Sequence, residues 1–190
     1  MRSIFNYPLK VVALRTCSFL LFALFTFSAK ADEAPELKQL RQKLLQAINS
    51  SKTTDSLYTV LNKIQVKPPV IMGYVGILES LKGKHAWNPY SKIKYLNSGQ
   101  RIMQQAITAD PHNIEIRYLR FSVEYHLPAF LGMAKHIAED RDEMLAMLAA
   151  KNYATADKQV AANIVKTLLE SKKCTAQQNE FLHKQQAELK

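Results

Sequence analysis

One helical segment gives way directly to another in the middle of this chain, and that junction constrains the fold more than any other feature. Apolar residues with helical spacing run over 90–109, Asp110-Pro111 interrupts them, and the same spacing resumes over 113–125. A helix that stops at a proline and is followed at once by a second helix folds back against it. The pattern predicts antiparallel helix pairs, an architecture that holds partners more often than it performs chemistry.

Helical periodicity dominates the rest of the chain after residue 34, and no segment sustains the period-2 alternation of a strand. We therefore expect an all-α fold in which about eight helices form stacked antiparallel pairs. The expected helices lie at about 35–48, 54–67, 69–84, 88–109, 113–126, 133–151, 155–169 and 175–182, with the residues after 182 polar enough to fray. Thr54 and Thr155 are the expected N-caps of the second and seventh helices, and Thr175 with Gln178 forms a capping box for the last.

The fifth of these segments has an unusual pattern. At 100° per residue its apolar residues fall into two stripes on opposite sides of the helix, Ile114, Tyr118, Phe121 and Tyr125 on one and Ile116, Leu119 and Val123 on the other. A helix with two opposed apolar stripes must be covered on both sides. The pattern predicts an interior helix, packed between neighbouring pairs.

The first 31 residues are interpreted as a secretory signal peptide. Basic residues precede an apolar run over 18–28, and the segment 29–31 has the small-x-small pattern of a cleavage site. The run is too short for a membrane span, which needs ~20 apolar residues. We expect a single helical-repeat domain over 32–190, with no membrane-spanning segment after cleavage, in a periplasmic or secreted protein.

The charge of residues 32–190 is moderate. They contain 22 Lys and Arg and 16 Asp and Glu, a net charge of +6 with both signs scattered. A nucleic-acid-binding protein would show a clustered basic stripe, so we expect no nucleic-acid partner. Cys174 is the single cysteine of this part, which leaves a buried inert thiol, the interpretation we favour, or an intermolecular disulfide.

The central stretch resembles a tetratricopeptide repeat. Tyr90, Gly99 and Ala106 occupy the aromatic, small and alanine positions of that motif, Pro111 is its closing proline, and residues 110–113 look like the turn between repeats. The resemblance covers about one and a half repeats. It implies a short α-α superhelix and brings no activity with it.

The next repeat departs from that motif. Arg117, Arg120 and Glu124 stand where packing residues are expected, and they share one polar face of the fifth helix. One hypothesis is that they line a binding surface and hold a partner's carboxylate or phosphate through bidentate arginine contacts. The alternative, which we favour, is a structural ion-pair network, because such networks imitate sites.

Two further groups of side chains could form a site. His136, Glu139, Asp140 and Glu143 share one helix face and could offer ligands to a metal, but such a cluster is usually a solvated face. Tyr74, Tyr118 and Tyr125 suit either an aromatic platform or the edge of the core, and the core is preferred. The sequence has no glycine-rich phosphate loop, nucleophile elbow or zinc spacing. We expect no metal, no cofactor and no enzyme.

These features favour an exported adaptor that binds a protein or peptide partner along the surface of residues 69–151, with Arg117 and Arg120 as polar anchors. The alternative is a small-molecule or lipid carrier, in which the apolar connection 127–132 folds down over a pocket between helices. A third hypothesis is an enzyme whose site is assembled on the face from His136 to Glu143.

Overall fold

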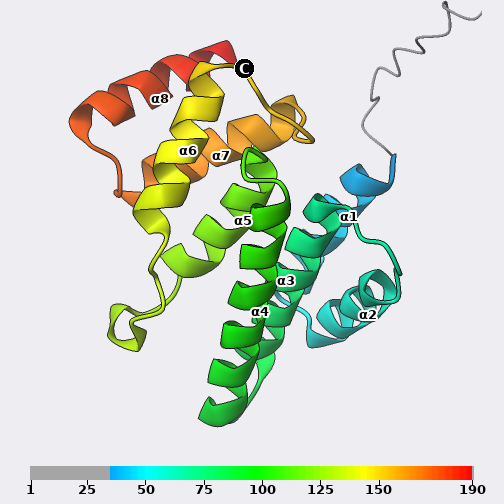
Figure 1. Cartoon of the computed structure of the whole chain (residues 1–190). Helices are drawn as coiled ribbons and strands as arrows, with labels where there is room; N and C mark the ends of the chain where they lie inside the picture. Colours follow the sequence, from blue (N-terminus) through cyan, green and yellow to red (C-terminus); the bar gives the residue numbers. More distant parts are fainter. Residues whose placement is uncertain (1–34, 190) are drawn as a thin grey trace, which may run out of the picture. The chain divides into compact units, whose positions relative to one another are not determined.

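The computed structural model describes residues 35–189, which form eight α-helices, one short 3-10 helix and, within those bounds, no strand. The elements are α1 (Pro35–Ala47), α2 (Ser51–Asn62), α3 (Pro69–His85), α4 (Pro89–Ala109), α5 (Ile114–Tyr125), η1 (Ala129–Leu131), α6 (Ile137–Ala149), α7 (Lys158–Ser171) and α8 (Ala176–Glu188) (Figure 1). The predicted all-α fold of about eight helices is confirmed. The described residues belong to one compact unit, Glu33–Lys190, and the predicted signal peptide lies outside them.

The helices are arranged as consecutive pairs. α1 contacts α2, α3 contacts α4, α5 contacts α6, and α7 contacts α8. The first members of the pairs also contact one another in order, α1 with α3, α3 with α5, and α5 with α7 (Figure 1). Each pair therefore stacks on the next, as the sequence predicts.

Two glycines allow the closest of these pairs, α3 and α4. A Cβ atom placed on Gly99 would lie 2.1 Å from Ser80 Oγ and 2.6 Å from the Gly76 carbonyl oxygen, and one on Gly76 would lie 2.5 Å from Met103 Cγ. Only glycine permits such an approach. A Cβ atom placed on Gly73, by contrast, would have its nearest neighbours at 3.4 Å, an ordinary van der Waals distance.

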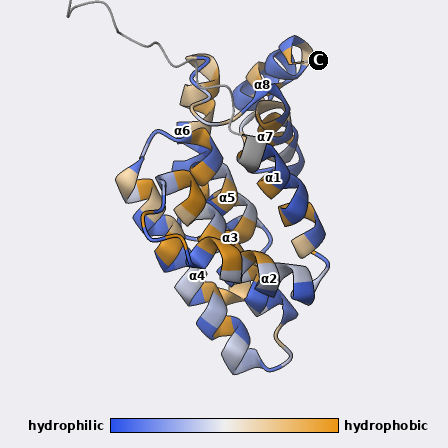
Figure 2. Cartoon of the chain, turned by 90° about the vertical axis from the view of Figure 1, so that its right-hand side faces the viewer, coloured by the Kyte–Doolittle hydropathy of each residue, from blue (hydrophilic) through white to orange (hydrophobic). Residues whose placement is uncertain are grey.

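α5 separates two hydrophobic cores. Ile116 and Leu119 belong to the core formed by α1–α4, whereas Ile114 and Phe121 belong to the core formed with α6–α8. Figure 2 shows hydrophobic residues gathered around α3 and α5, in the middle of the helix stack. The two opposed stripes read from the sequence are therefore two packing faces, and the predicted interior helix is confirmed.

A buried carboxylate ties both cores together. The guanidinium of Arg41 in α1 donates to both Glu115 oxygens at 2.8 Å, and Tyr74 Oη in α3 donates to Oε1 at 2.6 Å. Thr155 Oγ1, ahead of α7, donates to Oε2 at 3.1 Å. Burial, together with the neighbouring Glu115 carboxylate, raises the pKa of Tyr74 well above its usual range.

Two predicted N-caps are wrong. Ser50, not Thr54, caps α2 by accepting from the Thr53 amide, while the buried Thr54 Oγ1 donates to the Ala47 carbonyl oxygen at 2.8 Å. Asp157, not Thr155, caps α7, because Thr155 is turned toward Glu115. In both cases the threonine hydroxyl that the sequence pattern predicts as the cap instead donates to an oxygen atom of another element.

The ends of two other helices also differ from the prediction. α6 begins at Ile137 rather than near Met133, because Gly132 adopts a left-handed conformation (φ 61°) and η1 occupies the preceding residues. α8 continues to Glu188 instead of fraying after residue 182, and Gln185 is buried in it. The predicted capping box of Thr175 and Gln178 is confirmed, and Asn88 caps α4 by accepting from the Ser91 amide.

Candidate functional site

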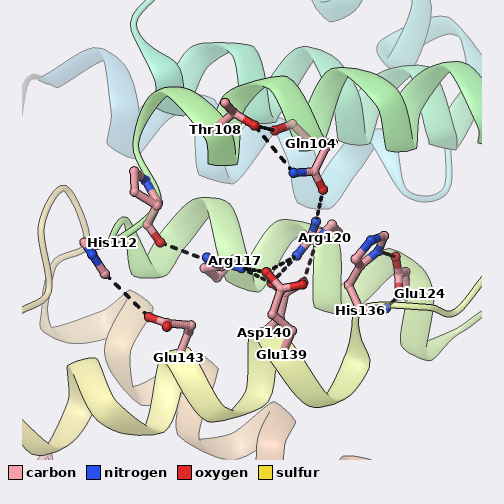
Figure 3. Close-up of polar contacts among 11 residues, drawn as sticks. Gln104, Thr108, His112, Arg117, Arg120, Glu124, His136, Glu139, Asp140 and Glu143 are labelled. Carbon is pink, nitrogen blue, oxygen red and sulfur yellow. Dashed lines mark hydrogen bonds and ion pairs between the residues drawn. The ribbon is translucent and has the colours of Figure 1, made fainter.

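Arg120, at the centre of the predicted site, is buried. It is 0% exposed, and its guanidinium meets the carboxylate of Asp140 in α6 through two hydrogen bonds of 2.7 Å, from Nε to Oδ2 and from Nη2 to Oδ1 (Figure 3). Nη1 donates to Gln104 Oε1 in α4 at 2.5 Å. One arginine thus joins α4, α5 and α6 through the fork geometry that suits carboxylates.

Arg117 lies one turn earlier on the same face of α5 and is also buried. Its Nη1 donates to Asp140 Oδ1 at 3.0 Å and to Glu139 Oε1, and its Nε donates to the Pro111 carbonyl oxygen at 3.1 Å. The Arg117 hydrogen bond outweighs the opposing effect of burial and lowers the pKa of Glu139 below its usual range. We call Arg117, Arg120, Glu139 and Asp140 the arginine cluster.

Glu124 is separate from the arginine cluster. Its Oε2 accepts from the His136 backbone amide and its Oε1 contacts His136 Nδ1, both at 2.7 Å. Within residues 35–189, Arg120 pairs with Asp140 rather than with Glu124, although the i, i+4 spacing allows that pairing. The structure thus brings Arg117 and Arg120 together on Asp140 and directs Glu124 to the start of α6 (Figure 3).

The burial of these residues changes what the binding hypothesis requires. The guanidinium groups already donate to Asp140, Glu139, Gln104 and the Pro111 carbonyl oxygen, so an external carboxylate would have to displace an internal partner. Removing one partner of a buried ion pair strands the other, which is strongly unfavourable. This geometry agrees with a structural ion-pair network, the interpretation favoured from the sequence. Partner binding through Arg117 and Arg120 stays a prediction.

The connection between α5 and α6, residues 127–136, is held at both ends. Gln100 Nε2 in α4 donates to the Met133 carbonyl oxygen at 2.7 Å, and Glu124 fixes His136. Between these anchors, η1 turns Phe130 outward, so that its side chain is 86% exposed. The carrier hypothesis expects the apolar connection 127–132 to fold down over a pocket, and the exposed Phe130 does not do so. We refer to residues 127–136 as the α5–α6 turn.

The four potential metal ligands between His136 and Glu143 are held by different partners. His136 contacts Glu124, Glu139 and Asp140 meet the arginines, and Glu143 lies 3.5 Å from His112 Nδ1 (Figure 3). Within residues 35–189, no three His, Cys, Asp or Glu side chains converge on a common point for a metal ion. Nothing in this geometry supports the enzyme hypothesis built on that face.

Sequence reasoning missed a second feature, at the connection between α3 and α4. Trp87 is 92% exposed and Tyr90 is 79% exposed. The sequence does contain an indication that Trp87 is exposed. The connection has only three residues, ends at the Asn88 cap and is followed by Pro89, so little chain is available to cover a tryptophan. The resemblance to the tetratricopeptide repeat suggests the opposite for Tyr90, because it places this residue at a packing position of the motif. We call residues 84–94 the α3–α4 tip.

The surface of residues 35–189 includes two open depressions. One, of about 260 Å³, is bordered by Trp87 together with Lys82, Tyr95 and Asp55. The other, of about 350 Å³, lies between α6 and α8 beside Leu145 and Phe181. Lys82 Nζ stands over the Tyr58 and Tyr95 rings, 4.2 and 4.7 Å from their centroids, which fixes one wall of the first depression.

Comparisons with known proteins give no relative for this chain: no family model, no curated protein and no solved structure matches it. The resemblance to tetratricopeptide repeats therefore stays a prediction. Among residues 35–189, none of the helices combines the length and the apolar character that crossing a bilayer requires.

Proposed function

We propose that this chain is an exported, non-catalytic adaptor of the cell envelope that binds a protein or peptide partner through the α5–α6 turn. The observation that carries the proposal is Phe130, a large aromatic side chain exposed on a short turn whose two ends are anchored. Exposed aromatic side chains on a preorganised element supply binding energy with little loss of conformational freedom.

The arginines take a different role here from the one the sequence suggests. Arg117 and Arg120 attach α6 to α5 through Asp140, and Glu124 fixes the backbone at His136, where the turn ends. They are positioning residues, which hold the turn while Phe130 and its neighbours contact the partner. The carrier alternative needs a pocket enclosed between helices, and no observation here favours it, since Phe130 faces solvent and both depressions are open.

The test begins with a photo-crosslinking amino acid at position 130 of the full-length protein in its own cells. The same group at Leu45, an apolar side chain that is 67% exposed on α1, is the matched control. We expect a protein that crosslinks from position 130 and not from position 45. Crosslinks that are the same from both positions, or none from either, would contradict the proposed surface.

The partner identified in this way is then purified and its affinity measured. Replacing an interface anchor costs about 2 kcal/mol or more, so Phe130→Ser should weaken binding by at least about 25-fold. Leu45→Ser should leave the affinity unchanged. Circular dichroism of both variants checks that the helices are intact, and equal affinities for the two folded variants would remove Phe130 from the interface.

A further inference from the structure

Positive charge is concentrated in one half of the described residues. Residues 35–109, which cover α1–α4, contain 11 Lys and Arg but only 3 Asp and Glu, whereas residues 110–189 contain 10 Lys and Arg and 11 Asp and Glu. The expectation that both signs are scattered is therefore wrong at the level of the helix pairs. One of the three acidic residues, Glu79, is itself buried beside Lys82. The α1–α4 half thus presents a positive surface, which attracts anionic partners.

The α3–α4 tip is the projecting end of this half. The α3–α4 hairpin extends past α2 and α5, with its connection at the bottom of Figure 1. Close contact between Gly76 and Gly99 and the Asn88 N-cap make this hairpin a firm support. At its end stand Trp87 and Tyr90, both largely exposed. Each has an apolar ring and a polar N–H or O–H group, the combination that concentrates at the boundary between lipid and water.

Lysines accompany the two aromatic residues. Lys84, Lys92 and Lys94 are all exposed within the tip, and Lys84 Nζ also donates to the Ile48 carbonyl oxygen at 2.7 Å. Among residues 35–189, Lys92 and Lys94 form no ion pair, so their charges are available to an outside group. Asp55 is the acidic residue that borders the neighbouring depression.

We propose that the α3–α4 tip docks the protein on an anionic phospholipid surface. Trp87 and Tyr90 enter the headgroup region, and Lys84, Lys92 and Lys94 lie against the lipid phosphates. Charge complementarity and the position of the aromatic residues at a projecting apex favour a lipid surface over an acidic protein, since protein anchors are enclosed by the partner around a packed centre. The α5–α6 turn is outside this contact, so the inference does not depend on the proposed partner binding.

The chain contains a built-in probe for this contact, because Trp87 is its single tryptophan. Residues 33–190, the compact unit, are mixed with vesicles of phosphatidylglycerol and phosphatidylcholine in equal parts, or of phosphatidylcholine alone. We expect the Trp87 emission to shift to shorter wavelength and to be protected from acrylamide with the anionic vesicles only. The protein should sediment with those vesicles and be released by high salt.

Matched charge changes then locate the contact. Each lysine neutralised near an anionic surface should weaken vesicle partition by about 5-fold, so Lys92→Gln with Lys94→Gln should weaken it by about 25-fold. The control removes the same charge from exposed positions on α7, with Lys158→Gln and Lys166→Gln, and should have a much smaller effect. Tyr90→Ala keeps the probe and should reduce the emission shift.

Three results would overturn the inference. Sedimentation with anionic vesicles without a Trp87 shift would place the contact on another surface. If the lysine substitutions on α4 and those on α7 weakened vesicle partition equally, the attraction would be general and not due to a docking site. A Trp87 shift with an acidic peptide such as polyglutamate, and none with vesicles, would assign the tip to a protein partner. Crosslinking from position 130 is unaffected by any of these outcomes, so this inference and the proposed function fail separately.

Discussion

The arginine cluster places two guanidinium groups and the carboxylate of Asp140 away from water. Burying charge is costly, and the cost is offset here because Arg120 meets Asp140 with two parallel hydrogen bonds while Arg117 donates to the same carboxylate. Asp140 is itself fully buried, whereas the Glu139 side chain is about half exposed. Asp140 is therefore the member on which the arrangement depends.

Replacing Arg120 should be severely destabilising. Arg120→Met removes two of the three arginine hydrogen bonds to the buried Asp140 carboxylate, and we expect the free energy of unfolding to fall by about 3–5 kcal/mol in urea denaturation. Arg101→Met, at an exposed position on α4, should change it by no more than about 0.5 kcal/mol. The double variant with Asp140→Leu should lose less than the two single variants added together. A loss of under about 1 kcal/mol for Arg120→Met would mean that the pair contributes little.

For individual residues, the sequence predicts which side chains share a helix face, and it does not predict the partners to which they bond. The spacing of Arg117, Arg120 and Glu124 places all three on one face of a helix, and they are found there. Asp140, which pairs with both arginines, lies 20 residues beyond Arg120 and across a turn. Nothing local fixes the rotation of α6 against α5, so this pairing requires the tertiary structure.

Whole helices were easier to predict than their ends. Proline positions and the Asn88 and Thr175 caps locate several boundaries, because backbone geometry alone decides them. The starts of α2 and α7 differ from the prediction because the hydroxyls of Thr54 and Thr155 donate to groups in other elements. Thr155, for example, donates to Glu115 in α5. The start of α6 differs because η1 and the left-handed Gly132 occupy the residues before it. In the sequence, the close packing of α3 on α4 is marked only by Gly76 and Gly99, since a helix interior otherwise disfavours glycine.

That packing makes a direct prediction for the α3–α4 hairpin. Gly99→Ala would place a methyl group against the α3 backbone and Ser80, so the free energy of unfolding should fall by about 1–3 kcal/mol. Gly73→Ala is the matched control within α3, where the methyl group meets ordinary contacts. It should be neutral or stabilising by up to about 1 kcal/mol, because alanine favours the helix. Thermal unfolding of both variants, followed by circular dichroism, distinguishes the two sites. Equal effects would show that the helices can separate without cost.

Across the whole molecule, α5 forms one wall of both hydrophobic cores. Ile116 and Leu119 face one core while Ile114 and Phe121 face the other, so neither core is complete without this helix. Glu115 adds a polar link from α5 to α1, to α3 and to Thr155, two residues before the α7 cap. The two halves should therefore unfold together.

Hydrogen exchange tests this coupling. Leu168→Ala opens a cavity in the second core and should lower the free energy of unfolding by about 2–5 kcal/mol. Because both cores share α5, backbone amides of α3 should exchange faster along with those of α7. Leu45→Ala, at an exposed position, should change neither set. Faster exchange confined to α6–α8 would show that the halves open independently.

Trp87 and Cys174 are placed so that the distance between them can be followed by fluorescence. Trp87 lies in the connection between α3 and α4, and Cys174, the free thiol among the described residues, lies in the connection between α7 and α8. Burial raises the pKa of the Cys174 thiol, so attaching a dye there calls for mildly alkaline conditions. With an acceptor dye on that sulfur, excitation energy transferred from the indole reports the separation of the two halves. Because Trp87 is the donor, the α1–α4 half needs no added label. A change in energy transfer would then report whether a partner or a lipid surface alters the separation of the two halves.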